Sequence, residues 1–239
     1  MPPFIPKPVY VGAAPLVRQA AERLAKTAIV RVQDSETGRV RVEDFLTVLA
    51  AVAGEAALTV GIAPTDIETA ELIPGSAVFG PQINDVLTGD TAEIKDVRVN
   101  CLVGILIKEL VPSVVPLSYF DQLERIYKLV ASSAGGAAWG HPALTVADDH
   151  RPSILPIQVA FEMRGVVDQA MTMAELPPEL RYVPCALALA SGIRQVAAAI
   201  DLSVAVTLAL EVTFGMAKMA PMSKAAFEKI ASEQRPKSN

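Results

Sequence analysis

A chain of 239 residues is long enough to bury a substantial hydrophobic core in one large domain or two small ones. Its net charge is −5, and its basic residues are scattered rather than gathered on one face beside aromatics or glycines, so nucleic acid is not an expected partner. Hydrophobic residues make up 51% of the chain but aromatic residues only 5%, so the apolar character comes from Ala, Val, Leu and Ile.

The apolar composition raises the question of a membrane-spanning helix, which needs about 18 or more apolar residues with few or no charges. The best window covers residues 200–220, but Asp201, Glu211 and Lys218 interrupt it. The longest uncharged run, residues 129–147, contains serines, glycines and a proline, a poor composition for a helix that faces lipid. Helices that cover one another explain the composition better. We therefore expect a soluble protein with no membrane partner.

The first twelve residues, MPPFIPKPVYVG, lack the basic segment, apolar core and cleavage site that identify a signal peptide. The two cysteines, Cys101 and Cys185, each lie inside an apolar run. Buried free thiols in a reducing cytoplasm are the simplest interpretation, and one disulfide is the alternative. These observations favour a cytoplasmic protein.

The chain opens with a proline-rich stretch, residues 1–14, which we expect to form an extended arm on the surface or on a neighbouring subunit. Pro15 suits the first turn of a helix, where its missing N–H costs no hydrogen bond. Apolar residues then recur at four-residue spacing, at Leu16, Ala20, Leu24 and Ala28. This spacing predicts an amphipathic first helix.

The next stretch, QDSETGRVRVEDF (residues 33–45), has the residue types of an EF-hand calcium loop. When Gly38 takes the sixth position of such a loop, the first three ligand positions fall on Gln33, Ser35 and Thr37. None of these is a carboxylate, and Asp44 at the last position is too short for the bidentate role of a glutamate. A calcium site is therefore not expected here.

A turn between two short strands explains the same stretch better. Residues 29–32 and 39–42 alternate, so that valines can share one face while arginines face water. Residues 35–38 would then turn the chain between them. The sequence predicts a short β-hairpin joining the first two helices.

Periodicity and capping signals predict the remaining helices in chain order. Asp201 is a plausible N-cap, and Gly89 a plausible stop signal. The predicted helices cover residues 43–60, 82–87, 94–111, 119–131, 156–174, 184–200, 202–217 and 223–232.

Residues 132–155 form the longest stretch without periodicity, and they hold the only tryptophan and both histidines. Loops of this length in a compact domain are uncommon and tend to be functional or disordered. The only concentration of metal-ligand side chains in the chain lies here, at His141, Asp148, Asp149 and His150. Two histidines with a carboxylate are a frequent donor set of metal-dependent enzymes, so these four are the candidate ligand or metal residues. The alternative is that the aspartates cap a turn and pair with His150 or Arg151.

Three charged residues, Arg194, Asp201 and Glu211, interrupt the apolar C-terminal helices and must be paired where they are buried. Ion pairing between helices is one explanation, and a polar anchor in a ligand pocket is the other. Methionines also gather between residues 163 and 222, where they fill core gaps or line an adaptable pocket or subunit interface.

The sequence thus predicts an all-α fold: a single multi-helix domain of seven or eight helices over residues 15–232, with at most a short β-hairpin near residues 29–42. The arm of residues 1–14 precedes this domain and a polar tail, residues 233–239, follows it. A domain boundary near Gly135 is the alternative.

No catalytic motif and no cofactor can be identified in the sequence. Surplus apolar surface in a soluble chain is often hidden in an interface, so we expect a homo-oligomer that acts through protein–protein contacts without catalytic machinery. The alternative is a helical metal-dependent enzyme, or a small-ligand-binding protein, with its site beside the 139–151 loop.

Overall fold

A computed structural model describes residues 11–62, 75–89, 91, 93, 97–134, 141–225, 227 and 228. Within these residues the chain is helical and contains two isolated β-bridges but no sheet, which confirms the all-α fold. Its α-helices are α1 (Pro15–Val32), α2 (Val42–Gly61), α4 (Pro81–Thr88), α5 (Leu102–Leu110), α6 (Leu123–Ser133), α7 (Pro156–Ala174), α8 (Tyr182–Val196) and α9 (Leu202–Ala217). Short 3-10 turns are η1 (Val11–Ala13), η3 (Leu117–Phe120), η4 (Asp148–His150) and η5 (Pro178–Leu180).

Helix ends follow the local signals of the sequence. Asp201 accepts a hydrogen bond from the Ser203 backbone N–H (2.7 Å) and is the N-cap of α9, as predicted. Gly89 ends α4 with a φ of 79°, a left-handed conformation that glycine adopts without steric cost. Residues 1–10 of the predicted arm, the polar tail, and residues 226 and 229–232 of the predicted last helix lie outside the described residues, whereas residues 11–13 of the arm form the 3-10 turn η1.

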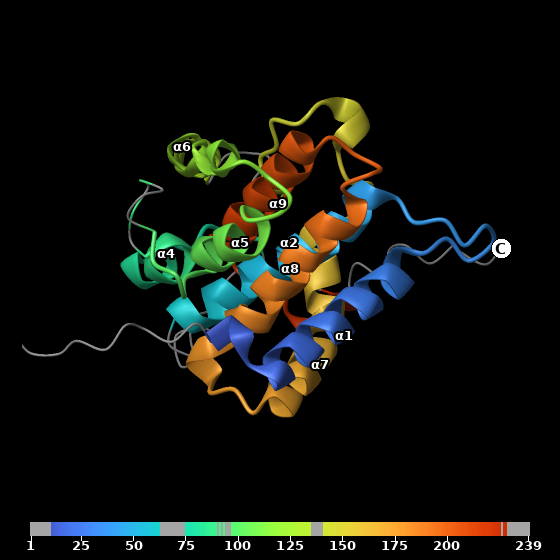
Figure 1. Cartoon of the computed structure of the whole chain (residues 1–239), viewed down its shortest axis with the longest axis horizontal. Coiled ribbons are helices and arrows are strands. Elements are labelled where there is room, and N and C mark those ends of the chain that lie inside the picture. The colour runs from blue at the N-terminus through green and yellow to red at the C-terminus, as the bar shows by residue number, and fades with distance from the viewer. Residues whose placement is uncertain are drawn as a thin grey trace, which may run out of the picture.

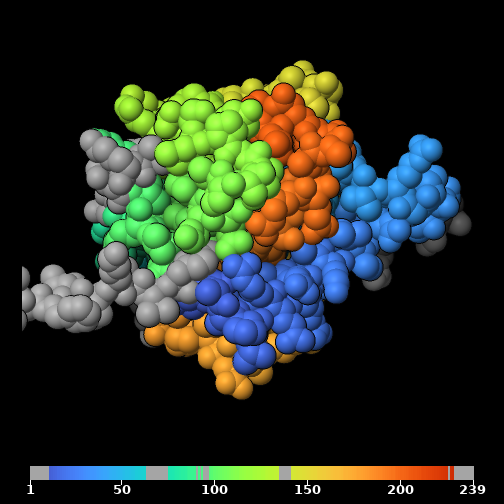
Figure 2. Space-filling model, viewed as in Figure 1, coloured from blue at the N-terminus to red at the C-terminus, as the bar shows by residue number. Residues whose placement is uncertain are grey.

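The prediction that residues 29–32 form a strand is wrong, because α1 continues to Val32. A two-stranded hairpin by itself is marginal in water, whereas a longer helix keeps its backbone bonded and lets Arg31 pair with Glu162 on α7. Only one bridge, between Gln33 and Val40, remains of the predicted ladder. The turn between them is present, and it projects from the helical body (Figures 1 and 2).

The prediction of a helix over 94–111 is too long at its start, because α5 begins at Leu102. Cys101 is extended, and its sulfur accepts a hydrogen bond from the Gly104 N–H (3.3 Å). The Arg98 carbonyl oxygen packs so closely on the helix that a Cβ atom at Gly104 would lie 1.9 Å from it. The preceding chain therefore folds across the start of α5 instead of extending it.

The helix α2 lies in the middle of the molecule, where α1, α4, α7, α8 and α9 all contact it (Figure 1). Nearly all of its residues are buried, and most of these are Ala, Val and Leu. In the described part of the chain, α2 is also the one helix long and apolar enough to cross a membrane, and 83% of its apolar window is buried inside the protein. A buried core helix has the same length and composition as a spanning helix, and in this structure other helices surround it.

Glycines allow α2 to approach its neighbours closely. A Cβ atom on Gly54 would lie 2.4 Å from the Thr213 carbonyl oxygen and 2.7 Å from Met216 Cβ, both on α9. Where α8 crosses α2, a Cβ atom on Gly192 would lie 2.5 Å from Leu49 Cδ1. These contacts need backbones without an intervening side chain.

Beyond α9 the chain runs antiparallel to the segment that precedes α4. The Val78 N–H donates to the Lys218 carbonyl (2.7 Å), and the Ala220 N–H donates to the Ser76 carbonyl (2.7 Å). Two segments far apart in the sequence are thereby fixed side by side. This pairing places the end of α9 next to Phe79 and the start of α4.

Replacing Gly54 by alanine is expected to lower the free energy of unfolding by about 2 kcal/mol, because the new methyl group would overlap a backbone carbonyl of α9. The matched control is Gly165→Ala on α7, where no atom lies within 4 Å of the added Cβ. That control should stabilise by up to about 1 kcal/mol through helix propensity. Urea unfolding compares the two variants, and an equal effect in both would contradict the close α2–α9 approach.

Candidate functional site

The predicted metal-ligand residues do not converge in the structure. The side chain of Asp148 is exposed and pairs with Arg151 Nε (3.0 Å), and His141 is exposed. His150 faces α2 instead, with its Nδ1 atom 3.0 Å from Glu43 Oε1. Among the described residues, no group of three or more His, Cys, Asp and Glu side chains is placed to hold a metal ion. Asp148 and His150 thus pair with different residues, and the side chains of His141 and Asp149 are exposed.

Hydrogen bonds hold residues 148–153 against the start of α2. Arg41 donates from Nη2 to the backbone carbonyls of Asp149 (3.0 Å) and Arg151 (2.6 Å). Asp44 accepts from the Ser153 N–H (2.6 Å). Negative side chains are favoured in the first turn of a helix, so this end of α2 is a natural place for carboxylates that hold a loop.

The buried charges of the C-terminal helices also have structural partners. Glu211 is fully buried on α9 and accepts hydrogen bonds from the N–H (2.8 Å) and the hydroxyl (2.6 Å) of Thr145. Arg125 Nη2 lies 3.1 Å from the same carboxylate. Arg194 donates to the Glu109 carbonyl (2.9 Å). Glu211 and Arg194 thus form the ion pairs between elements that were one of the two predicted explanations, whereas Asp201 is exposed and caps α9.

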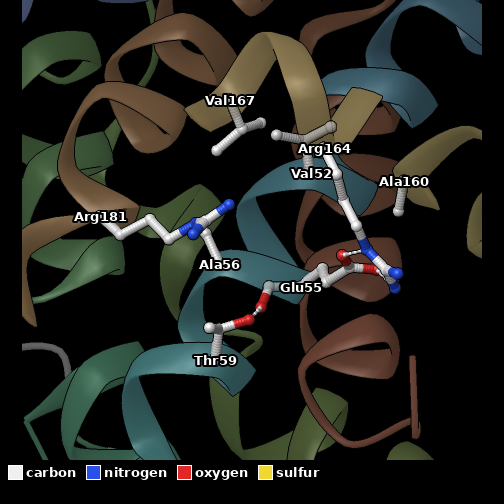
Figure 3. A pocket seen from close by; sticks show the side chains of 8 residues that line it. All are labelled: Val52, Glu55, Ala56, Thr59, Ala160, Arg164, Val167 and Arg181. Atoms are coloured by element: carbon white, nitrogen blue, oxygen red, sulfur yellow. Dashed lines mark hydrogen bonds and ion pairs between the residues drawn. The ribbon is translucent and has the colours of Figure 1, made fainter. Parts of the chain in front are cut away.

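A small cavity between α2 and α7 contains charged groups that satisfy one another (Figure 3). Arg164 donates to Glu55 through Nε (2.5 Å) and Nη2 (3.2 Å), and Arg181 pairs with Asp168. The cavity volume of about 20 Å³ is room for one water molecule. This arrangement joins α7 to α2 and leaves no space for a ligand.

Both cysteines are free and buried, as expected. Burial raises the pKa of Cys101 to about 11 and that of Cys185 to about 12. Since the thiolate is the reactive form of cysteine, neither side chain is suited to act as a nucleophile near neutral pH.

A larger cavity, of about 350 Å³, lies between α4, α6 and the end of α9. Much of its wall consists of Phe79, Tyr127 and Val130. Lys218, the residue that follows α9, also lines it. The Tyr127 ring packs edge-on against Phe214 at 5.1 Å, and its hydroxyl lies 2.8 Å from the Thr88 hydroxyl oxygen. The aromatic wall is therefore held in place from two sides. We refer to this space as the Lys218 cavity.

Lys218 is only 5% exposed, unlike a typical lysine. Its ammonium donates to Asn84 Oδ1 (2.6 Å), and among the described residues no carboxylate pairs with it. Burial lowers its pKa to about 8, because water no longer stabilises the charged form. A buried ammonium whose partner is a neutral amide lacks the opposite charge that would offset its burial.

Lys128 provides a contrast on the rim of the same cavity. It lines the cavity, but its side chain is 75% exposed and its Nζ lies 2.6 Å from Glu124 Oε1. Two lysines therefore border one space, one buried beside an amide and one solvated beside a carboxylate. This pair offers a matched control for experiments on the buried amine.

The comparisons with known proteins do not identify the chain. Neither the family models, nor the curated proteins, nor the solved structures give a match to it. The case for a function therefore rests on the geometry and charge of this chain alone.

The Lys218 cavity was not predicted from the sequence. The available signal is a single lysine in an apolar run, GMAKMA, without an acidic residue three or four positions away. That pattern identifies a lysine without a partner on its own helix, but not the residues that surround it. Asn84 and Tyr127 come from α4 and α6, and only the tertiary structure brings them together.

The contact of His150 with Glu43 predicts a dependence of stability on pH. The hydrogen bond to Glu43 raises the pKa of His150 above 6.5. The contribution of the protonated His150 to the free energy of unfolding is therefore complete below pH 6.5 and is lost as pH rises through the raised pKa. Despite desolvation by burial, the hydrogen bond from His150 holds the pKa of Glu43 below 4.5, so its contribution is present above pH 4.5 and is lost at lower pH.

The pair should therefore stabilise the fold most between about pH 4.5 and 6.5. Urea unfolding across this range should show the largest difference between the wild-type protein and Glu43→Gln there, and NMR titration should show a lower His150 pKa in the variant. A His150 pKa that is unchanged in Glu43→Gln would show that the contact does not form in solution.

Proposed function

We propose that this protein binds a small, largely apolar molecule that carries a single carboxylate, with the carboxylate beside Lys218. The observation that carries the proposal is the buried ammonium, whose one partner among the described residues is the Asn84 amide oxygen. Removing one charge from water without an opposite charge is costly, and a ligand carboxylate would supply that charge. An ammonium has three N–H donors, so two remain for such a ligand.

The walls of the cavity support an apolar body for the ligand. Phe79, Tyr127, Val130 and Ala131 contribute most of its non-charged lining. Phe79 is 61% exposed, and ligand binding would cover part of its apolar surface. The volume of about 350 Å³ is near the lower end of the range for small-molecule sites.

The position of Lys218 on α9 supports a singly charged group rather than a phosphate. Lys218 follows the last residue of α9, so the negative end of the helix dipole lies close to the site. Multiply charged anions are favoured beside arginines, and no arginine is part of this lining. One lysine at a helix C-terminus suits one negative charge.

Homo-oligomer formation and a cytoplasmic location stay predictions from composition. The surplus of apolar residues that suggested an interface is also explained within one chain, because the apolar residues of α2, α8 and α9 are buried against one another. Binding in the Lys218 cavity belongs to the small-ligand alternative that the sequence left open, at a different place from the 139–151 loop.

Titration calorimetry with octanoate tests the proposal, and octanol provides a ligand of the same length without the charge. Lys218→Met should weaken octanoate binding by about tenfold to a hundredfold, because a charge-assisted hydrogen bond contributes about 1.5–3 kcal/mol. Lys128→Met should leave the affinity within about twofold, since exposed pairs contribute little.

Asn84→Asp provides a second variant that preserves the shape of the site. A carboxylate at position 84, 2.6 Å from the ammonium, would be a permanent counter-ion and should also reduce octanoate binding at least tenfold. Octanol bound as tightly as octanoate, or unchanged octanoate affinity in both Lys218→Met and Asn84→Asp, would refute the proposal.

The same site predicts a pH profile for binding. The carboxylate binds the protonated amine, whose pKa in the free protein is about 8. Affinity for octanoate should therefore be nearly constant between pH 6 and 7.5 and fall by up to about tenfold for each pH unit above 8. Calorimetry at a series of pH values measures the profile. A constant affinity from pH 6 to 10 would show that Lys218 does not titrate in the site.

A further inference from the structure

We propose that Lys218 also captures aldehydes as a covalent imine, so that the cavity holds carbonyl compounds as well as carboxylates. The inference rests on the proposed function, because both use the same apolar cavity and the same side chain. Three features of the structure support it: the amine is buried, it reaches a cavity with room for a ligand, and its one partner among the described residues is a neutral amide.

The reaction needs no oxidant or reductant. The lone pair of the neutral Lys218 amine attacks the carbonyl carbon and the C=O π bond breaks; one nitrogen proton is transferred to the former carbonyl oxygen, which gives a carbinolamine. The nitrogen then loses its remaining proton as the hydroxyl group leaves with a proton, so the products are an imine and one water molecule. Lysine imines of this kind are an established form of covalent catalysis.

Burial favours this reaction at Lys218 over other lysines. With a pKa of about 8, roughly one in ten Lys218 side chains is unprotonated at pH 7, against fewer than about one in a thousand for a solvated lysine. A lowered pKa in an apolar pocket is a recognised way to activate a lysine amine. The exposed Lys128, paired with Glu124, lacks this feature.

Imine formation also removes the buried positive charge of Lys218. An ammonium is costly to bury, whereas an uncharged imine is not. The aldehyde chain would lie against Tyr127 and Val130. Asn84 would retain the ability to donate a hydrogen bond through its amide nitrogen.

Reductive trapping tests the inference. The full-length protein is incubated with octanal and cyanoborohydride at pH 7, and peptide mapping by mass spectrometry follows the labelling of each lysine with time. Lys218 should be labelled at least about tenfold faster than Lys128, which borders the same cavity. Octanoate in excess should slow the labelling of Lys218 and leave that of Lys128 unchanged.

Two variants separate this inference from the proposed function. Lys218→Arg keeps the positive charge but cannot form an imine, so octanoate binding should remain while the fast labelling disappears. Asn84→Asp should raise the Lys218 pKa and slow its labelling at least tenfold, and circular dichroism confirms that each variant is folded.

The outcomes are distinct. Octanoate binding without fast labelling of Lys218 would overturn the imine and leave the proposed function standing. Fast labelling of Lys218 without octanoate binding would support the imine and overturn carboxylate binding. Labelling of Lys218 no faster than that of Lys128 in the folded protein overturns the inference.

Discussion

The close approach of α2 and α9 at Gly54 is the contact on which the rest of the structure depends. The α9 atoms nearest to a Cβ at this position belong to Thr213, Met216 and Ala217, and the next residue in the chain is Lys218. The depth at which α9 lies against α2 therefore also sets the depth of the lysine. Pairing of residues 218–220 with the segment before α4 then brings the amine to Asn84. The α2–α9 contact and this pairing together position Lys218 beside the cavity.

This packing explains the unusual composition. Helices built from Ala, Val, Leu and Gly can approach closely enough to bury one another without large aromatic side chains. Charged side chains that lie inside such a packed structure are removed from water and must therefore be paired. Glu211 meets Arg125 and Thr145, and Glu55 meets Arg164. These pairs connect the outer elements, such as α6 and α7, to the core.

Local signals in the sequence were sufficient for much of the fold. Helices that begin at a capping residue or a proline, such as α7 and α9, lie at the predicted positions. Errors arose where tertiary contacts decide between local alternatives. Residues 29–32 alternate like a strand but continue α1, which packs on α7, and residues 97–101 cross the start of α5 instead of joining it. The candidate site was missed for the same reason, since a lone lysine does not reveal which distant residues surround it.

Glu211 and Lys218 show why the cavity is the more informative of the polar sites. Glu211 lies within α9 and Lys218 is the residue that follows this helix, and both are almost fully buried. The carboxylate of Glu211 has a backbone N–H, a hydroxyl and a guanidinium as partners, which is what a buried charge requires. The ammonium of Lys218 has an amide oxygen and an adjoining space of about 350 Å³. One of these two buried charges thus has its partners within the protein, whereas the other lies beside a cavity, where the proposed ligand carboxylate would be its counter-ion.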